Sequence, residues 1–160
     1  MRTLGVASSL LRRTPRDIYL MPLSDLDAFP ERLSIDSPCF VLLLLAADFM
    51  ARYCDRDRLF QRILDAGCVY FCAWGNGCEH MHDWFDWFLV EKELKTGEPI
   101  GNIMTTWHSA DSLEEAVEFA IVSAEPDDQY AAGCGAVVLA TVGSSEWAGQ
   151  VQQAASQHVI

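Results

Sequence analysis

Long hydrophobic runs are missing from this sequence of 160 residues. The longest uninterrupted apolar stretch, residues 39–47, is nine residues long, whereas a membrane-spanning helix needs about 20. The early apolar stretch, residues 4–11, contains two serines and is followed by arginines, so it lacks the form of a secretory signal. We therefore expect a cytoplasmic protein whose six cysteines are reduced thiols.

Positive charge is scarce as well. Eleven Lys and Arg residues face 23 Asp and Glu residues, a net charge of −12, and none of the Lys or Arg residues lies beyond Lys95. A nucleic-acid-binding protein needs clustered basic side chains, and an anionic membrane surface attracts them. The composition therefore excludes nucleic acid and an anionic membrane surface as partners. A basic protein partner would be attracted electrostatically. The sequence does not indicate an oligomeric state.

The few basic residues are unevenly placed. The first 16 residues carry four arginines and no acid, and the remaining 144 carry a net charge of −16. This change predicts a flexible basic arm over residues 1–16, followed by a single α/β domain over residues 17–160. We expect the arm to pack little against the domain.

Several catalytic and cofactor motifs are absent. The turn Gly75-Asn76-Gly77 continues neither as G-x-G-x-x-G nor with the lysine of a phosphate-binding loop, and no serine lies in G-x-S-x-G. Cys72 and Cys78 are six residues apart, a spacing that suits no structural zinc site. We expect no metal and no cofactor.

The pattern that is present is an alternation of strands and helices. Strands are expected at residues 40–46, 68–73, 102–107 and 135–141, with an edge strand at 17–21. Helices are expected after Asp55 or Asp57, over residues 78–95, after Ser112, and after Ser144 or Ser145. This order predicts an α/β three-layer sandwich with a mostly parallel sheet of four to five strands, Rossmann-like or flavodoxin-like.

Ligands of such sheets bind at the carboxyl ends of the strands, where several polar segments of this chain would meet. The candidate acid–base residues there are Glu79, His82, His108 and Asp48. The candidate ligand-binding residues are Trp74, Asn76, Cys78, Asp83, Thr106 and Ser144. Glu79 and His82 are three residues apart at a helix start, and His108 ends a strand, so we expect them on one edge.

Other interpretations of these residues stay open. Cys78 and His82 have the spacing of a nucleophile and its base, and Ser145, His108 and Asp48 could form a hydrolase triad. The same helical stretch continues into apolar residues, so structural packing is the simpler account of Cys78 and His82. The dense tryptophans around residue 84 fit either a broad core or an interface.

The stretch AGCVYFCAWGNGCEHMHDWFD, the later MTTWH and the AEP at residues 124–126 together resemble a known family. This family consists of small bacterial α/β proteins described only as a domain of unknown function, with AGC-x-YFCAWG-x-x-CE-x-x-HD and TTWH motifs. The resemblance covers about residues 37–148. It implies a stand-alone cytosolic protein and no activity.

Two functions from different classes fit these observations. The first is a non-enzymatic binding or immunity-type interaction module, favoured by the acidity, the excess of tryptophan and the lack of a catalytic motif. The second is a small enzyme or ligand sensor with an acid–base site at the carboxyl edge of the sheet. Convergence of the four acid–base candidates on one cleft would favour the second.

Overall fold

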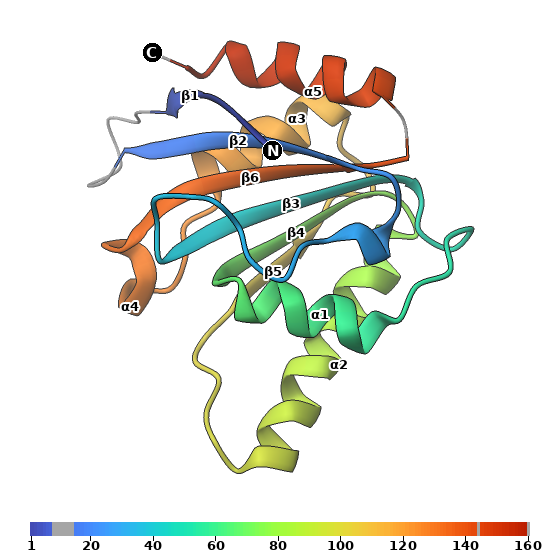
Figure 1. Cartoon of the computed structure of the whole chain (residues 1–160), viewed down its shortest axis with the longest axis vertical. Helices are drawn as coiled ribbons and strands as arrows, with labels where there is room; N and C mark the ends of the chain where they lie inside the picture. Colours follow the sequence, from blue (N-terminus) through green and yellow to red (C-terminus); the bar gives the residue numbers. More distant parts are fainter. Residues whose placement is uncertain (8–14, 144, 160) are drawn as a thin grey trace.

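A computed structural model describes residues 1–7, 15–143 and 145–159. The fold is α/β, with a six-stranded, mostly parallel mixed sheet flanked by helices (Figure 1). The strands are β1 (Arg2–Ala7), β2 (Arg16–Leu23), β3 (Cys39–Asp48), β4 (Cys68–Asn76), β5 (Met104–Trp107) and β6 (Cys134–Val142). Their order in the sheet is β1-β2-β6-β3-β4-β5.

The described helices begin in two cases at capping side chains that the sequence suggests. They are α1 (Arg56–Asp65), α2 (Cys78–Thr96), α3 (Leu113–Glu118), α4 (Asp128–Ala131) and α5 (Ser145–Ser156), with a 3-10 turn η1 (Leu26–Ala28) and a π-helical segment η2 (Phe119–Ser123). The Asp55 carboxylate accepts from Arg58 N and caps α1. Ser112 and Glu115 form a reciprocal capping box on α3. No helix in the described ranges is both long and apolar enough to cross a bilayer.

Each face of the sheet is covered by its own helices. One core layer joins the sheet to α1 and α2, and the other joins it to α3, η2 and α5. From β3 the chain passes through β4 to β5 at the edge of the sheet, and α1 and α2 connect these strands on the first face. It then returns to β6 through α3 and η2 on the second face. This arrangement keeps one hand of crossover throughout.

Two interior strands are covered on both faces, which explains their composition. In β3 the first eight residues are all buried, and β6 is buried over nearly its whole length. Successive side chains of these strands alternate between the two core layers, so a continuous apolar run satisfies both. The expected strands at residues 40–46, 68–73 and 135–141 are therefore confirmed, and each is two or three residues longer in all than expected.

The N-terminus differs from the expectation. Residues 2–7 form β1, which pairs antiparallel with β2, and Arg16 at the start of β2 is buried. The prediction of a loosely packed arm is wrong for these residues, while residues 8–14 lie outside the described part. Because β1 covers its outer side, β2 is an interior strand and not the expected edge strand, and the sheet has six strands instead of four or five. The sequence hides β1 because its apolar residues follow no sustained period.

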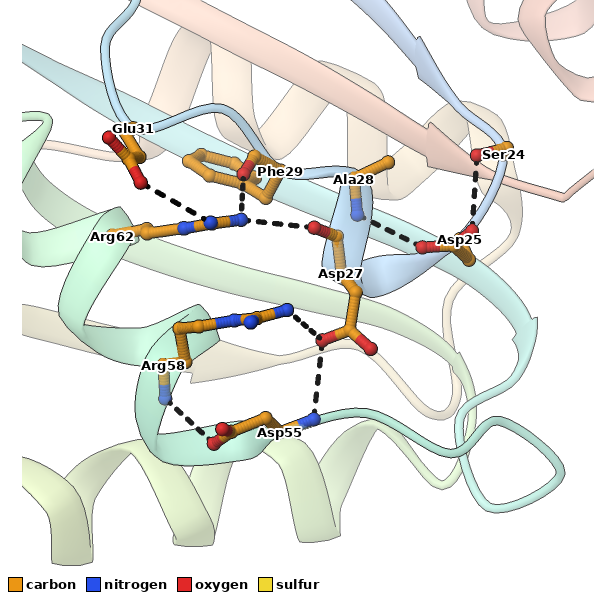
Figure 2. A network of polar contacts seen from close by, with 9 residues as sticks. All are labelled: Ser24, Asp25, Asp27, Ala28, Phe29, Glu31, Asp55, Arg58 and Arg62. Atoms are coloured by element: carbon orange, nitrogen blue, oxygen red, sulfur yellow. Dashed lines mark hydrogen bonds and ion pairs between the residues drawn. The ribbon is translucent and has the colours of Figure 1, made fainter.

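The segment between β2 and β3 is fixed to α1 by a polar network (Figure 2). Arg62 Nη1 donates to the carbonyls of Asp27 and Phe29, each at 3.0 Å. Asp27 also accepts from Asp55 N at 3.2 Å and faces Arg58 at 3.6 Å. A connection with little regular structure is therefore held over the α1 face of the sheet.

The helix after Ser112 also departs from a regular pattern. The expected helical face over residues 113–124 is present, but α3 changes to the π-helical η2 at Phe119. Ala124 N donates to the Phe119 carbonyl at 2.8 Å, the five-residue spacing of a π-helix.

Candidate functional site

A cleft of about 550 Å³ opens at the carboxyl edge of the sheet. Strand β4 is followed by α2 on one face of the sheet, and the neighbouring β5 is followed by α3 on the other face. The cleft lies where these two connections diverge. This carboxyl-edge cleft is lined by Ala47, Met50, Trp74, Gly75, Asn76, Gly77, Cys78, Glu79, His80, His108, Ser109, Asp111 and Trp147.

The turn from β4 to α2 forms one wall of the cleft. Gly75 has a φ of +123°, and a Cβ there would lie 1.7 Å from the Ala46 carbonyl oxygen. Only glycine allows the turn to pass so close to β3. The turn then places the first residues of α2, Cys78 to His80, along the cleft.

Two tryptophans form an aromatic corner opposite α2. The rings of Trp74 and Trp147 meet edge to face with centroids 5.5 Å apart. Trp74 Nε1 donates to the Asp111 carbonyl at 2.8 Å, which ties β4 to the segment after β5. The corner thus brings together β4, α5 and the β5–α3 connection.

His108 lies beside this corner and is held on both ring nitrogens. Its Nδ1 is 2.6 Å from Asp111 Oδ2, and its Nε2 is 3.2 Å from Thr106 Oγ1. Phe119 of η2 packs on the imidazole with ring centroids 4.6 Å apart. His108 is therefore a rigid, nearly buried group whose edge reaches the cleft.

The Thr106 hydroxyl also contacts Cys72 beneath the cleft. Burial raises the pKa of the Cys72 thiol to about 12, and the hydrogen bond with Thr106 opposes this only in part. The thiol therefore stays protonated near neutral pH and cannot serve as a nucleophile there.

His82 has a separate set of partners. Its Nδ1 is 2.9 Å from Asp83 Oδ1, and its Nε2 is 3.0 Å from Thr105 Oγ1 and 3.5 Å from Asp86 Oδ2. The Thr105 hydroxyl donates to Asp86 at 2.8 Å, and the imidazole packs on Trp107 at 4.6 Å. His82 is buried and does not line the carboxyl-edge cleft.

The two histidines lie on opposite faces of β5. His82 binds Thr105 and His108 binds Thr106, and successive residues of a strand point to opposite sides. The rings that pack on them confirm this, because Trp107 covers His82 and Phe119 covers His108. Of the four acid–base candidates, the cleft therefore brings together only Glu79 and His108.

The remaining candidates are divided in the same way. Asp48 stands outside the lining, and its carboxylate accepts from Met50 N at 2.9 Å and Ala51 N at 3.2 Å. The cleft is lined by Trp74, Asn76 and Cys78. The other two candidates contact the histidines instead, Asp83 with His82 and Thr106 with His108. Ser144 lies outside the described residues.

The charge of the lining is acidic. Its carboxylates are Glu79 and Asp111, and no Lys or Arg lines the cleft within the described part of the chain. Over the same described ranges, no group of three or more His, Cys, Asp and Glu side chains is arranged to hold a metal ion. The expectation that the protein uses no metal stays a prediction.

Asp111, His80 and Trp147 are three of the lining residues that were not among the sequence candidates. Asp111 could have been found from its spacing of three residues after His108, since a strand end and a following turn often share such a contact. His80 borders the cleft and stacks on Trp84 with ring centroids 5.9 Å apart. Trp147 comes from α5, and no local pattern links it to Trp74.

Comparison with known proteins adds a family match. A family model described as Domain of unknown function (DUF7684) matches residues 18–158. This match confirms the resemblance to a family of unknown function. That the two sequence motifs are typical of this family stays a prediction. No curated protein matches the chain.

Proposed function

The chain belongs to the domain-of-unknown-function family DUF7684. For this chain we propose a non-enzymatic binding module that recognises a basic protein partner. The observation that carries this proposal is the lining of the carboxyl-edge cleft. Two tryptophans and two carboxylates meet there, and no Lys or Arg of the described residues opposes them. We propose that the cleft takes a lysine or arginine side chain of the partner.

The chemistry of the lining supports a cationic group. Tryptophan is the aromatic side chain that attracts a cation most strongly through its ring face. The exposed Glu79 carboxylate supplies an opposite charge at the start of α2. The whole chain carries a net charge of −12, which accelerates the approach of a basic partner.

The arrangement of the acid–base candidates supports binding over catalysis. Only Glu79 and His108 share the cleft, and both ring nitrogens of His108 already have partners. Asp48 closes a turn, and His82 is packed on the other face of β5. The four candidates are thus divided among separate places, whereas acid–base catalysis needs them to act on one substrate.

One observation favours the second candidate function, a small enzyme or ligand sensor. Thr106, His108 and Asp111 form a hydroxyl–imidazole–carboxylate chain of the kind that activates a nucleophile. The test compares ester hydrolysis by the wild type and by His108→Gln with p-nitrophenyl acetate. A rate that His108→Gln abolishes in the folded protein would favour the enzyme over the binding module.

The binding proposal is tested with short peptides that differ at one residue, arginine or glutamine. We expect the arginine peptide to bind more tightly and to change the tryptophan fluorescence. Glu79→Gln should weaken this binding about two- to fivefold, the effect of one partly exposed ion pair. The matched control is Glu114→Gln, which removes the same charge from an exposed residue outside the cleft.

Two outcomes would contradict the binding proposal. The first is equal affinity for the arginine and glutamine peptides. The second is an equal loss of affinity in Glu79→Gln and Glu114→Gln, because that would show attraction to the overall charge and not to the cleft.

The topology supports a finer fold proposal, a three-layer sandwich of the Rossmann-like type. With β3 counted as strand one, the order β5-β4-β3-β6 follows the 3-2-1-4 part of the Rossmann order. The N-terminal β2 takes the place of strand five. We also propose a cytoplasmic location, because six cysteines that form no disulfide are typical of a reducing compartment.

A further inference from the structure

Helix α2 carries apolar side chains on two opposite sides. Its inner side places Met81 and Phe85 in the core layer beneath the sheet. Its outer side carries Trp87, Val90 and Leu94, which are 67%, 49% and 80% exposed. These three residues, here called the outward stripe, follow one another at spacings of three and four, so they lie along one line on the helix surface.

The position of α2 leaves the outward stripe open. Figure 1 shows the C-terminal half of α2 reaching beyond the sheet, at the bottom of the view. Trp107 ends the edge strand β5, contacts His82 of the same helix, and is itself 44% exposed. Three large exposed apolar side chains in one line on a helix are more than single scattered surface residues, and such a stripe is typical of an interaction surface.

The surroundings of the outward stripe are acidic. Residues 83–98 contain five acids and two lysines, a net charge of −3. Asp83, Asp86 and Glu91 have half-exposed carboxylates on this helix. This net charge already counts the two lysines, of which Lys95 pairs with Glu91 at 3.2 Å and Lys92 donates to Gln61 at 2.8 Å.

From these observations we infer that the outward stripe is a docking surface for a basic amphipathic helix of a partner protein. The stripe spans eight residues, about 11 Å of helix, which suits the ridge-and-groove packing of a second helix. Lysines and arginines beside the partner's apolar face would meet the acidic border of the stripe. A second copy of this chain fits less well, since it would bring an equally acidic border.

This inference goes beyond the proposed function, because no residue of the outward stripe lines the carboxyl-edge cleft. The probe is a synthetic amphipathic helix of leucine and lysine, compared with a scrambled peptide of the same composition and with a leucine–glutamate helix. Affinity is measured by fluorescence anisotropy of the labelled peptides. We expect only the ordered leucine–lysine helix to bind tightly.

The variants separate apolar docking from charge attraction. Val90→Gln with Leu94→Gln leaves the net charge unchanged and should weaken binding of the ordered peptide about tenfold or more. Both side chains are exposed, so the protein should keep its fold. The matched control is Tyr53→Gln, an exposed aromatic residue outside the stripe, which should leave the affinity unchanged. Glu79→Gln should also leave it unchanged, so this inference and the cleft proposal can fail separately.

Three results would overturn the inference. The first is unchanged affinity in the double variant, which would mean that the acidic charge alone attracts the peptide. The second is equal binding of the scrambled peptide. The third is a dimer in sedimentation equilibrium that the double variant abolishes, which would make a second copy the occupant of the outward stripe.

Discussion

At the scale of single residues, Arg16 is a buried charge with three polar partners. Its side chain is only 2% exposed, at the start of β2. The guanidinium donates to the carbonyls of Ala124 at 2.7 Å and Cys134 at 3.2 Å, and it faces Glu125 at 3.1 Å. One side chain therefore joins β2, the end of η2 and the start of β6.

Replacing Arg16 by methionine should destabilise the protein by about 3 kcal/mol. The apolar side chain fills similar space but leaves two carbonyls without these donors in a buried environment. Urea unfolding of Arg16→Met measures the loss. The matched control is Arg58→Met, since Arg58 is 53% exposed and its contact with Asp27 is 3.6 Å long. That change should cost less than about 1 kcal/mol, and equal costs for the two variants would contradict the role assigned to Arg16.

At the scale of elements, β1 closes the sheet on the side of β2. It pairs with β2 from Arg2 to Ala7, and Ala7 and Leu4 pack against the core layer under α5. Val159, the last residue that the structure describes, also lies against β1, because a Cβ on Gly5 would be 2.2 Å from its Cγ1. Two ends of the chain thus meet on one edge of the sheet.

Deleting residues 1–7 should therefore destabilise the protein by about 2 kcal/mol or more. The deletion removes a row of strand hydrogen bonds and uncovers apolar residues of β2. Thermal unfolding, with a lower midpoint expected, is the measurement. Val6→Gln serves as the control, since this side chain is exposed and the change keeps the strand. An unchanged midpoint after the deletion would support the loose arm that the charge pattern suggested.

At the scale of the whole molecule, the two core layers hold the cysteine thiols. All six cysteines are free, and five of them are buried. Burial raises the pKa of Cys72 to about 12 and that of Cys134 to about 11, from an ordinary value of 9.0. It also raises the pKa of Cys68 well above that value.

These shifts predict a loss of stability at alkaline pH. Between about pH 9 and pH 11 the unfolded chain releases its thiol protons, while the folded chain keeps them. The unfolded state then binds fewer protons, so the free energy of unfolding falls by up to about 1.4 kcal/mol per pH unit for each such thiol. Urea unfolding at a series of pH values measures the slope.

A comparison of two variants assigns this slope to the buried thiols. Cys72→Ala should flatten it, although the variant is less stable at neutral pH because of the cavity. Cys54→Ala should change it less, since Cys54 is only half-buried. A free energy of unfolding that stays constant up to about pH 11 would contradict the prediction.

Most of the sheet could be predicted from the sequence. Residues 40–46 and 135–141 are continuous apolar runs, and only strands buried on both faces need such a composition. Asp55, Ser112 and Glu115 act within one helical turn of their own backbone, so their capping roles are local. The carboxyl edge as the place of the candidate site also followed from the strand–helix alternation, since parallel strands end on one side.

The tertiary structure alone decided which of these residues meet. Thr105 and Thr106 are neighbours in sequence, yet the pleat of β5 sends their histidines, His82 and His108, to opposite faces. Trp147 reaches Trp74 because the strand order puts β6 beside β3, and that order depends on long-range packing. The sequence by itself determined the elements, whose causes are local, while contacts between distant segments required the folded chain.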